Sequence, residues 1–376
     1  MRIAIDVSVL KQAPATGVEK ALLQFLRGLE HSDADHDFLL VAPRRPDLLP
    51  ELRDPRFRFF ALSAGKPPLL WRERLVPAFA HRERIDLWHS PVQAIPLLLD
   101  RPKVATMHEL SWLETKGVGD EGAVARRRVM AFMVAKAADL VVCVSRRTRL
   151  NFLALHPSAE PRAVAVPHGV DDRFALARED RAGLELRLGI PAGERYFLTV
   201  GRALKRKGLP HAVRAFRVHL DRTGSNDRLV LAGPRNARLE EALDLARELG
   251  LGARVQAPGY VPDADLPALY AGAAALLVPS ESEGFGLPVL EGMAAGTPVI
   301  AHRASALPEV GGDAALLVDF HDPPAIAAAM SRATGPERPA ILAAGRQHAA
   351  AFPEDLPARR LLELWPELLP GAEAGP

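Results

Sequence analysis

The chain has 376 residues, of which 48% are hydrophobic and 25% are charged. This composition excludes a disordered chain, and the length exceeds what one hydrophobic core usually supports. Lys and Arg number 48 against 46 Asp and Glu, a balance that argues against a dedicated nucleic-acid binder. We therefore expect two globular domains and no nucleic-acid partner.

Cysteine content and hydrophobic patterning indicate where the protein works. Cys143 is the only cysteine, so no intramolecular disulfide can form and a reducing compartment fits best. No segment approaches the roughly 18 apolar residues of a membrane span, and Asp6 comes too early for an export signal. We expect a cytoplasmic protein. Peripheral contact with the cytoplasmic membrane face stays open, because Lys66–Phe79 mixes apolar and cationic residues as amphipathic membrane helices do. Packing of that segment on a sheet is the favoured alternative.

Short apolar runs alternate with amphipathic stretches in the first half, a pattern typical of strand and helix units that feed a parallel sheet. A helix is predicted at Val18–Leu29, where the apolar residues recur at helical spacing. Strands are predicted at Arg2–Val7, Asp37–Val41, Arg56–Leu62, Asp86–His89, Val104–Met107, Leu140–Val144 and Ala163–Val166.

The same alternation lapses between Pro167 and about Asp180 and restarts at Tyr196–Val200. We place the domain boundary in that lapse, with one domain at 1–180 and a second at 181–354. In such α/β sheets, ligands bind at the carboxyl ends of the strands. Further strands are predicted at Arg228–Ala232, Ala253–Gln256, Ala274–Val278, Pro298–Ala301 and Ala315–Val318, with helices at Leu239–Leu249 and Leu287–Ala295.

The most informative stretch, Pro279–Met293, leaves a predicted strand, passes a glycine pair and enters a helix. Gly284 and Gly286 permit backbone conformations that side chains forbid, and free amides beside a helix N-terminus bind anions or sugar oxygens. Glu283 is expected at the mouth of this loop and Glu291 one turn into the helix. A glycine-rich turn with two solvated glutamates would explain the same residues.

Two cations, Arg202 and Lys207, follow directly after the predicted strand Tyr196–Val200. A cation placed there can reach a diphosphate leaving group, although two solvated surface cations are the alternative. Asp33–Asp35 and Asp263–Asp265 have the D-x-D spacing of metal sites, but their loop and helix-start contexts favour caps. We predict no metal.

Histidines and glycines in the first half offer further candidates. His108 follows the strand Val104–Met107, so it is expected at the carboxyl edge of the sheet, whereas His89 is expected to be structural. Gly117–Gly122 spells the dinucleotide fingerprint G-x-G-x-x-G, but it does not join a first strand to its helix. A mobile loop on the acceptor side is the favoured interpretation.

Glu283 and Glu291 are separated by seven residues, and with Gly284-Phe285-Gly286 and Gly296–Val299 they resemble the E-x7-E motif of the retaining glycosyltransferase family 4. The bacterial branch similar to O-antigen and capsule mannosyltransferases fits best. One departure is Glu109, where the family often has Asp. Further matches cover nearly the whole chain, at Thr16–Glu19, Thr106–Leu110, Ala138–Ser145, Val166–Asp171, Val200–Arg202, Arg206–Gly208 and Leu269–Ala273.

The resemblance implies the GT-B fold, in which two Rossmann-like α/β domains face each other across a cleft and a helix at about 355–372 packs back on the first. It implies transfer of a hexose, with retention of configuration, from a nucleotide diphosphate sugar to a hydroxyl of a glycan, lipid-linked or small-molecule acceptor. GDP-mannose is the first choice of donor and UDP-hexoses the second, with no further cofactor.

The resemblance also implies roles for the candidate residues. Arg202 and Lys207 would replace the metal ion of other glycosyltransferases. Glu283 would hold sugar hydroxyls, Glu291 the ribose hydroxyls, and His108 would lie against the donor sugar. The remaining donor contacts are expected at Gly17, Gly201, Gly284, Phe285, Gly286 and Leu287.

Alternatives from other classes stay open. A nucleotide-sugar epimerase of similar fold would bind a related donor but need no acceptor. A nicotinamide oxidoreductase would need its glycine fingerprint directly after the first strand, where this chain has only Gly17. A catalytically silent sugar-binding relative would not need both glutamates and both cations.

Overall fold

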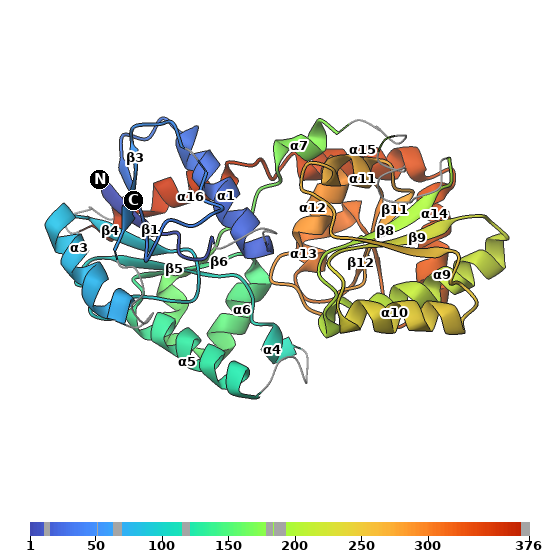
Figure 1. The fold of residues 1–376 in the computed structure, drawn as a ribbon, viewed down its shortest axis with the longest axis horizontal. Coiled ribbons are helices and arrows are strands. Elements are labelled where there is room, and N and C mark those ends of the chain that lie inside the picture. Colours follow the sequence, from blue (N-terminus) through green and yellow to red (C-terminus); the bar gives the residue numbers. More distant parts are fainter. Residues whose placement is uncertain are drawn as a thin grey trace. The chain divides into compact units, whose positions relative to one another are not determined.

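The computed structural model describes residues 1–10, 16–50, 52–62, 70–114, 121–177, 183 and 193–369. They divide into two compact units, one within Met1–Trp112, Gly119–Gly169 and Glu354–Pro376, and the other within Leu113–Val118 and Val170–Pro353. Each unit contains one parallel sheet with helices around it (Figure 1), so the expected α/β class with two Rossmann-like sheets is confirmed. The boundary predicted at 180 lies outside the described residues, as do 117–120 of the predicted glycine loop.

The sheet of the first unit has the order β3-β2-β1-β4-β5-β6-β7, and every neighbouring pair is parallel. The order reverses between β1 and β4, which is the topological switch point of a doubly wound sheet. The strands are β1 (Arg2–Asp6), β2 (Asp37–Ala42), β3 (Phe57–Ala61), β4 (Leu87–Ser90), β5 (Lys103–Met107), β6 (Leu140–Cys143) and β7 (Ala163–Ala165).

Side chains that alternate along these strands supply both faces of the sheet. Ile3 and Ile5 of β1 face α1 (Gly17–Glu30) and α16 (Leu356–Leu364), whereas Ala4 faces the opposite layer. Figure 1 shows α16 beside α1 in this unit. Trp365, at the end of α16, is fully buried against Phe25 of α1. The helix ends there because Pro366 follows, and a short 3-10 turn (Pro366–Leu368) stands where the helix predicted at about 355–372 would continue.

The opposite layer of the first unit contains a π-helical turn (Trp71–Leu75), α3 (Val76–Glu83), α5 (Glu121–Ala137), α6 (Arg146–Leu155) and a 3-10 turn (Pro157–Arg162), and α4 (Ser111–Glu114) begins in this unit. Trp71, Val76 and Phe79 are buried in a core with Trp88 of β4. The apolar face of the predicted amphipathic segment is therefore internal, which favours sheet packing over a membrane-bound helix for its described part, 70–79.

The sheet of the second unit has the order β10-β9-β8-β11-β12-β13, again parallel throughout. Its switch point lies between β8 and β11. Helices α9 (Leu209–Thr223), α10 (Ala237–Glu248) and α14 (Pro323–Thr334) share one apolar cluster with the sheet, and α12 (Leu287–Ala294) packs against α15 (Arg338–Ala349). The strands are β8 (Tyr196–Val200), β9 (Arg228–Ala232), β10 (Val255–Gly259), β11 (Ala275–Val278), β12 (Val299–His302) and β13 (Leu316–Val318).

The helices of the second unit begin at recognisable caps or prolines. Asn236 accepts the amide of Leu239 at the start of α10, and Asp322 accepts that of Ala325 at the start of α14. No helix in the described part of the chain is both long enough and apolar enough to cross a bilayer. The helices are α7 (Asp172–Ala175), α9 (Leu209–Thr223), α10 (Ala237–Glu248), α11 (Leu266–Ala271), α12 (Leu287–Ala294), α13 (Leu307–Gly311), α14 (Pro323–Thr334) and α15 (Arg338–Ala349), with 3-10 turns at Lys205–Lys207 and Gly312–Ala314.

Candidate active site

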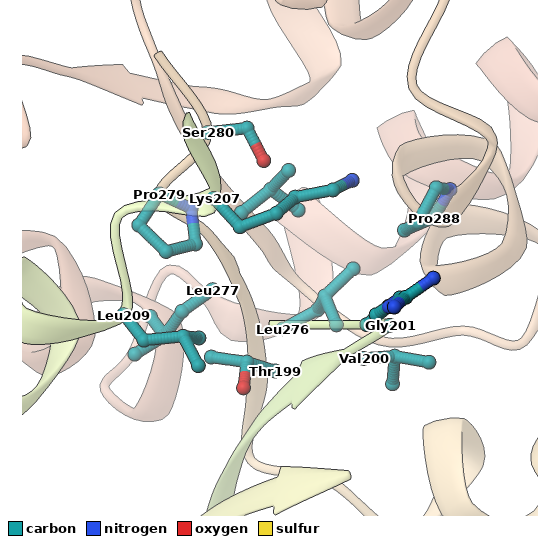
Figure 2. Close-up of a pocket in the computed structure, with 12 residues that line it drawn as sticks. Thr199, Val200, Gly201, Lys207, Leu209, Leu276, Leu277, Pro279, Ser280 and Pro288 are labelled. Atoms are coloured by element: carbon teal, nitrogen blue, oxygen red, sulfur yellow. The ribbon is translucent and has the colours of Figure 1, made fainter. Parts of the chain in front are cut away.

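A pocket of about 360 Å³ lies at the switch point of the second unit, where the carboxyl ends of β8 and β11 diverge. Figure 2 shows Lys207, Ser280 and Pro288 on one side of it and Thr199 and Val200 on the other. A doubly wound sheet binds its ligands at this position because the connections leave opposite faces there and open a crevice. Arg202 and Gly201 also line it.

The loops after β8 and β11 approach each other so closely that one position excludes any side chain. Gly208 has φ of 60°, and a Cβ atom added there would collide with the carbonyl oxygen of Pro279. Backbone bonding continues the contact, because the amide of Glu281 donates to the carbonyl of Arg206 at 2.8 Å. The glycine thus fixes the distance between the loop that carries Lys207 and the loop that carries Glu283.

Glu283 is held between two cations from the loop after β8. Lys207 forms an ion pair with Glu283 Oε1, and Arg206 Nη1 lies 3.2 Å from Oε2 while also donating to the Ser282 carbonyl at 2.8 Å. The side chains of Glu283, Arg206 and Lys207 expose only 9%, 11% and 20% of their surfaces. The structure thus brings together two of the predicted catalytic residues, Lys207 and Glu283, and adds Arg206, to which the sequence analysis gives no role.

The charge on Glu283 is stabilised by these contacts. Burial alone raises the pKa of a carboxyl group, but Lys207, Arg206 and a hydrogen bond from Ser280 together hold the pKa of Glu283 below its ordinary value. Its backbone is fixed too, since the Glu283 amide donates to Ser305 Oγ at 3.1 Å and that hydroxyl donates to the Glu283 carbonyl at 2.8 Å. Ser305 adopts a left-handed φ of 57°, a strained backbone conformation of the kind that clusters at functional sites.

The glycine loop enters α12 as the sequence predicts. Gly286 has φ of 107° directly before the helix, whereas Gly284 is not among the positive-φ residues. Only one of the two predicted glycines therefore uses a conformation that side chains avoid. Phe285 is buried and packs edge-on against Phe352, and Leu287 is partly buried as the first residue of α12.

Glu291 lies one turn into α12 and receives a hydrogen bond from Tyr270, whose hydroxyl is 2.6 Å from Oε2. Tyr270 is fully buried, and burial together with the Glu291 charge raises the pKa of its phenol well above the ordinary value. The phenol therefore remains a donor at all working pH values. Tyr270 belongs to α11, so the sequence spacing that finds Glu291 does not find its partner.

Arg202 differs from the buried cations. Its side chain is exposed at the edge of the pocket and makes no hydrogen bond or ion pair with any residue that the structure describes. Neighbouring Gly201 has φ of 123°. With no partner among the described residues, Arg202 can contact a ligand in the pocket without first breaking a protein contact.

The first unit has its own pocket of about 410 Å³, which three histidines line together with apolar residues of α1 and α16. His108 lies just beyond β5, as predicted, and donates through Nε2 to the Pro91 carbonyl at 2.7 Å. Its ring stacks on that of His168 at 5.5 Å between centroids. Burial lowers the pKa of His108. For His89 and His168, burial and, to a smaller extent, the nearby His108 lower the pKa to about 3. The pocket therefore contains neutral imidazoles at pH 7.

Other predicted residues lie outside both pockets or play smaller parts. Gly17 is the exposed first residue of α1, a helix whose start is stabilised by the Thr16 amide donating to Glu19 at 2.7 Å. Asp265 stands at the N-cap of α11 but makes no side-chain cap bond, and Asp33–Asp35 precedes a strand, not a helix. The capping role predicted for Asp33–Asp35 is therefore wrong, whereas Asp265 occupies the predicted cap position of α11 without a side-chain cap bond of its own.

The geometry defines an α/β protein with a carboxylate held between two cations beside its switch-point pocket, and comparison with known proteins gives the family. The Glycosyltransferase Family 4 model matches residues 15–174 and the Glycosyl transferases group 1 model matches residues 184–337. The D-inositol 3-phosphate glycosyltransferase of Corynebacterium diphtheriae is 31% identical over 387 residues, covering 93% of this chain and 90% of the relative. The chain therefore belongs to glycosyltransferase family 4.

Two further similarities agree with this family. The O-antigen chain mannosyltransferase B of Escherichia coli is 29% identical over 276 residues, 72% of each chain. The structure of Anabaena Alr3699/HepE in complex with UDP-glucose has a TM-score of 0.78 at 19% identity, covering 98% of this chain and 100% of that one. The fold is thus the GT-B fold, and the protein is a glycosyltransferase.

Proposed function

We propose that this glycosyltransferase moves a hexose from a nucleotide diphosphate sugar to an acceptor hydroxyl with retention of configuration. The observation that carries the proposal is the cationic cluster at the switch-point pocket, in which Arg206 and Lys207 flank Glu283, and Arg202 at the rim has no partner within the described part of the chain. A leaving nucleoside diphosphate needs positive charge where its own negative charge grows, and preorganised cations supply it without reorganisation.

The charges in this cluster do not cancel. Glu283 contributes one negative charge against the two positive charges of Arg206 and Lys207, so the buried group keeps one net positive charge. Arg202 at the pocket edge adds a second. This excess supports metal-independent binding of a diphosphate, with the nucleotide sugar as substrate and no further cofactor.

The residues then divide the chemistry as follows. The bond between the anomeric carbon and the diphosphate oxygen breaks, and its electron pair leaves with the diphosphate, which Arg202 and Lys207 stabilise. The acceptor oxygen attacks the same face of the sugar, and its proton leaves with the diphosphate. Glu283 binds sugar hydroxyls beside the developing positive charge, and Glu291 binds the ribose. His108 shapes the side from which the acceptor approaches.

For the donor we propose GDP-mannose first and UDP-hexoses second. The similarity to a relative named as an O-antigen chain mannosyltransferase supports the first choice, and the fold shared with a protein solved with UDP-glucose supports the second. For the acceptor we propose a hydroxyl of a glycan, a lipid-linked glycan or a small molecule. Relatives named for D-inositol 3-phosphate add a phosphorylated polyol to the small molecules worth testing.

We further propose a cytoplasmic enzyme that touches the membrane face peripherally, through α5 and not through the segment 66–79. Val129 and Phe132 on α5 each expose 52% of their surface, and Met133 exposes 38%. Exposed Arg126 and Lys136 lie on the same helix. Apolar side chains beside cations fit an anionic bilayer surface, where a lipid-linked acceptor would be presented.

Product analysis tests the main proposal. The chain is incubated with GDP-mannose, UDP-glucose or UDP-N-acetylglucosamine, with and without acceptor, while nucleoside diphosphate release is followed. We expect release that depends on acceptor and a product whose anomeric configuration, measured by NMR, equals that of the donor. Conversion of the donor sugar without any acceptor would identify an epimerase, and an inverted product would exclude the retaining mechanism.

A further inference from the structure

A second cluster of polar side chains lies in the second unit, built by three segments that converge. His211 comes from the first turn of α9, Glu281 from the loop after β11, and His321 from the segment after β13. His211 Nε2 lies 3.8 Å from Glu281 Oε1, and the His211 and His321 rings stand nearly perpendicular with centroids 4.6 Å apart. One ligand atom from each residue falls within a common span of 4.8 Å.

From this geometry we propose that His211, Glu281 and His321 bind a divalent transition metal, with Zn²⁺ as the fitting ion. Two imidazole nitrogens and one carboxylate oxygen are ligands that zinc accepts, and they discriminate against Mg²⁺ and Ca²⁺, which prefer oxygen alone. Around tetrahedral zinc, bonds of about 2.0–2.1 Å place ligand atoms roughly 3.3 Å apart. His211 and Glu281 are thus almost at that separation, and the exposed His321 side chain has only to turn inward.

A competing arrangement uses His302, Asp319 and His321, whose ligand atoms also lie within 4.8 Å. Two of these residues, Asp319 and His321, are exposed, and Asp319 Oδ1 already accepts the His321 amide at 2.8 Å. The first group has only one exposed member, and its carboxylate and imidazole already face each other. We therefore assign the ion to His211, Glu281 and His321.

The position of this site gives it a consequence for the donor pocket. Glu281 lies two residues before Glu283, and its amide bonds to the Arg206 carbonyl at 2.8 Å. The His211 amide donates to the carbonyl of Gly208 at 3.0 Å, and Gly208 directly follows Lys207. The ion would therefore join the two loops that carry Lys207 and Glu283. Its role is to hold them in register, and it takes no part in sugar transfer.

The experiment uses the full chain without a polyhistidine tag, dialysed against EDTA and then freed of it. Zinc chloride alone is the probe, and bound zinc is measured by equilibrium dialysis while the melting temperature is recorded. We expect one saturable zinc per chain and a higher melting temperature with zinc than with magnesium. His321→Ala and Glu281→Gln should each weaken zinc binding by about tenfold or more, because even outer-shell partners contribute that much.

Matched variants separate this assignment from the rival cluster. Asp319→Asn and His81→Ala, an exposed histidine of the first unit, should bind zinc as the unaltered chain does. If zinc is not bound saturably, or if His321→Ala binds it unchanged, the proposed site does not exist. If Asp319→Asn loses zinc while Glu281→Gln keeps it, the ion belongs to the other cluster and the assignment is wrong. None of these readouts depends on the donor or acceptor.

Discussion

Lys207 and Glu283 form an ion pair across the loops that follow β8 and β11. Both side chains are therefore positioned before a donor binds, and in the proposed mechanism each interacts with a different part of that donor. The cation can turn to the diphosphate while the carboxylate, still paired with Arg206, stays charged beside the sugar. This division of labour makes distinct predictions for the two sides of the pair.

Removal of a pocket cation should slow transfer strongly. Lys207→Ala or Arg202→Ala is expected to lower kcat/KM on the order of a hundredfold, as loss of a preorganised group opposite a developing anion does. Lys205→Ala, which removes an exposed cation from the same turn, is the matched control and should cost little. Steady-state rates of diphosphate release measure all three. Losses below about threefold at Lys207 and Arg202 would mean that both are ordinary surface cations.

Substitution of Glu283 and of Glu291 should affect different kinetic constants. Glu291→Gln is expected mainly to raise KM, because the ribose that Glu291 is proposed to bind does not change during the reaction. Glu283→Gln is expected mainly to depress kcat, because a carboxylate beside the sugar gains importance as positive charge develops. Complete kinetic profiles for both variants test this. A folded double variant with near-normal transfer would remove the donor site from this position, and interchanged signatures would reverse the two roles only.

Tyr270→Phe is the internal control for the Glu291 result, because it removes the 2.6 Å hydrogen bond and leaves the buried ring. If Glu291 acts on the ribose directly, Tyr270→Phe should raise KM less than Glu291→Gln does. An equal effect would indicate that Glu291 serves only to fix α11 against α12.

Chelation of divalent ions should leave transfer intact. In the proposed mechanism Arg202 and Lys207 supply the positive charge that the diphosphate needs, so EDTA is expected to change neither donor affinity nor turnover at 25 °C. Any effect of the proposed zinc ion should show in the melting temperature instead. Loss of turnover with EDTA and its recovery with magnesium would disprove the assignment of the cations.

Acid should weaken the first unit through its buried histidines. Burial lowers the pKa of His89 to about 3, whereas an unfolded histidine titrates near about 6.5. The unfolded chain therefore binds the proton more readily. The contribution to stability is complete above about pH 6.5 and declines as the pH falls toward 3, by about 2 kcal/mol at pH 5. Urea denaturation at pH 7.5 and at pH 5 should show that the free energy of unfolding falls less for His89→Gln than for the unaltered chain. Identical losses in both proteins would contradict the prediction.

Membrane contact should depend on α5. With vesicles that contain anionic lipid, sedimentation is expected to recover the chain, and more salt should weaken binding. Phe132→Ser together with Val129→Ser should reduce the bound fraction severalfold. Exposed Leu176→Ser, placed in the other unit, serves as the control. Equal binding by all variants would place the contact elsewhere.

Much of the fold was predictable because buried parallel strands are short apolar runs. The ranges predicted for β8 and β9 agree with the structure to the residue. Ends set by hydrogen bonding are harder, and β10 extends to Gly259, three residues past its predicted end, despite Pro258. The helix predicted at about 355–372 ends early, before Pro366, which cannot continue the hydrogen-bond ladder.

The candidate site was predictable only where its residues share a local spacing. Glu283 and Glu291 belong to one loop and helix, so their separation in sequence becomes a separation in space. The sequence predicts Lys207, but nothing in it indicates that the adjoining Arg206 also turns toward Glu283 while Lys205 stays exposed. Tyr270 is 21 residues from Glu291 in the sequence. Ser305 is 22 residues from Glu283. Such contacts depend on how strands and helices pack, and a single sequence does not encode them visibly.

The return of α16 to the first unit bears on how the protein is made. Ala358, Leu361 and Trp365 complete the core that begins with Ile3 and Ile5, whereas Val170–Pro353 of the second unit is one continuous stretch. During synthesis on the ribosome, the second unit is therefore complete before the first unit is. The apolar face of α1, including Phe25, is covered only after α16 has been synthesised. A chain released before Leu356 would expose that apolar face to chaperones and to aggregation.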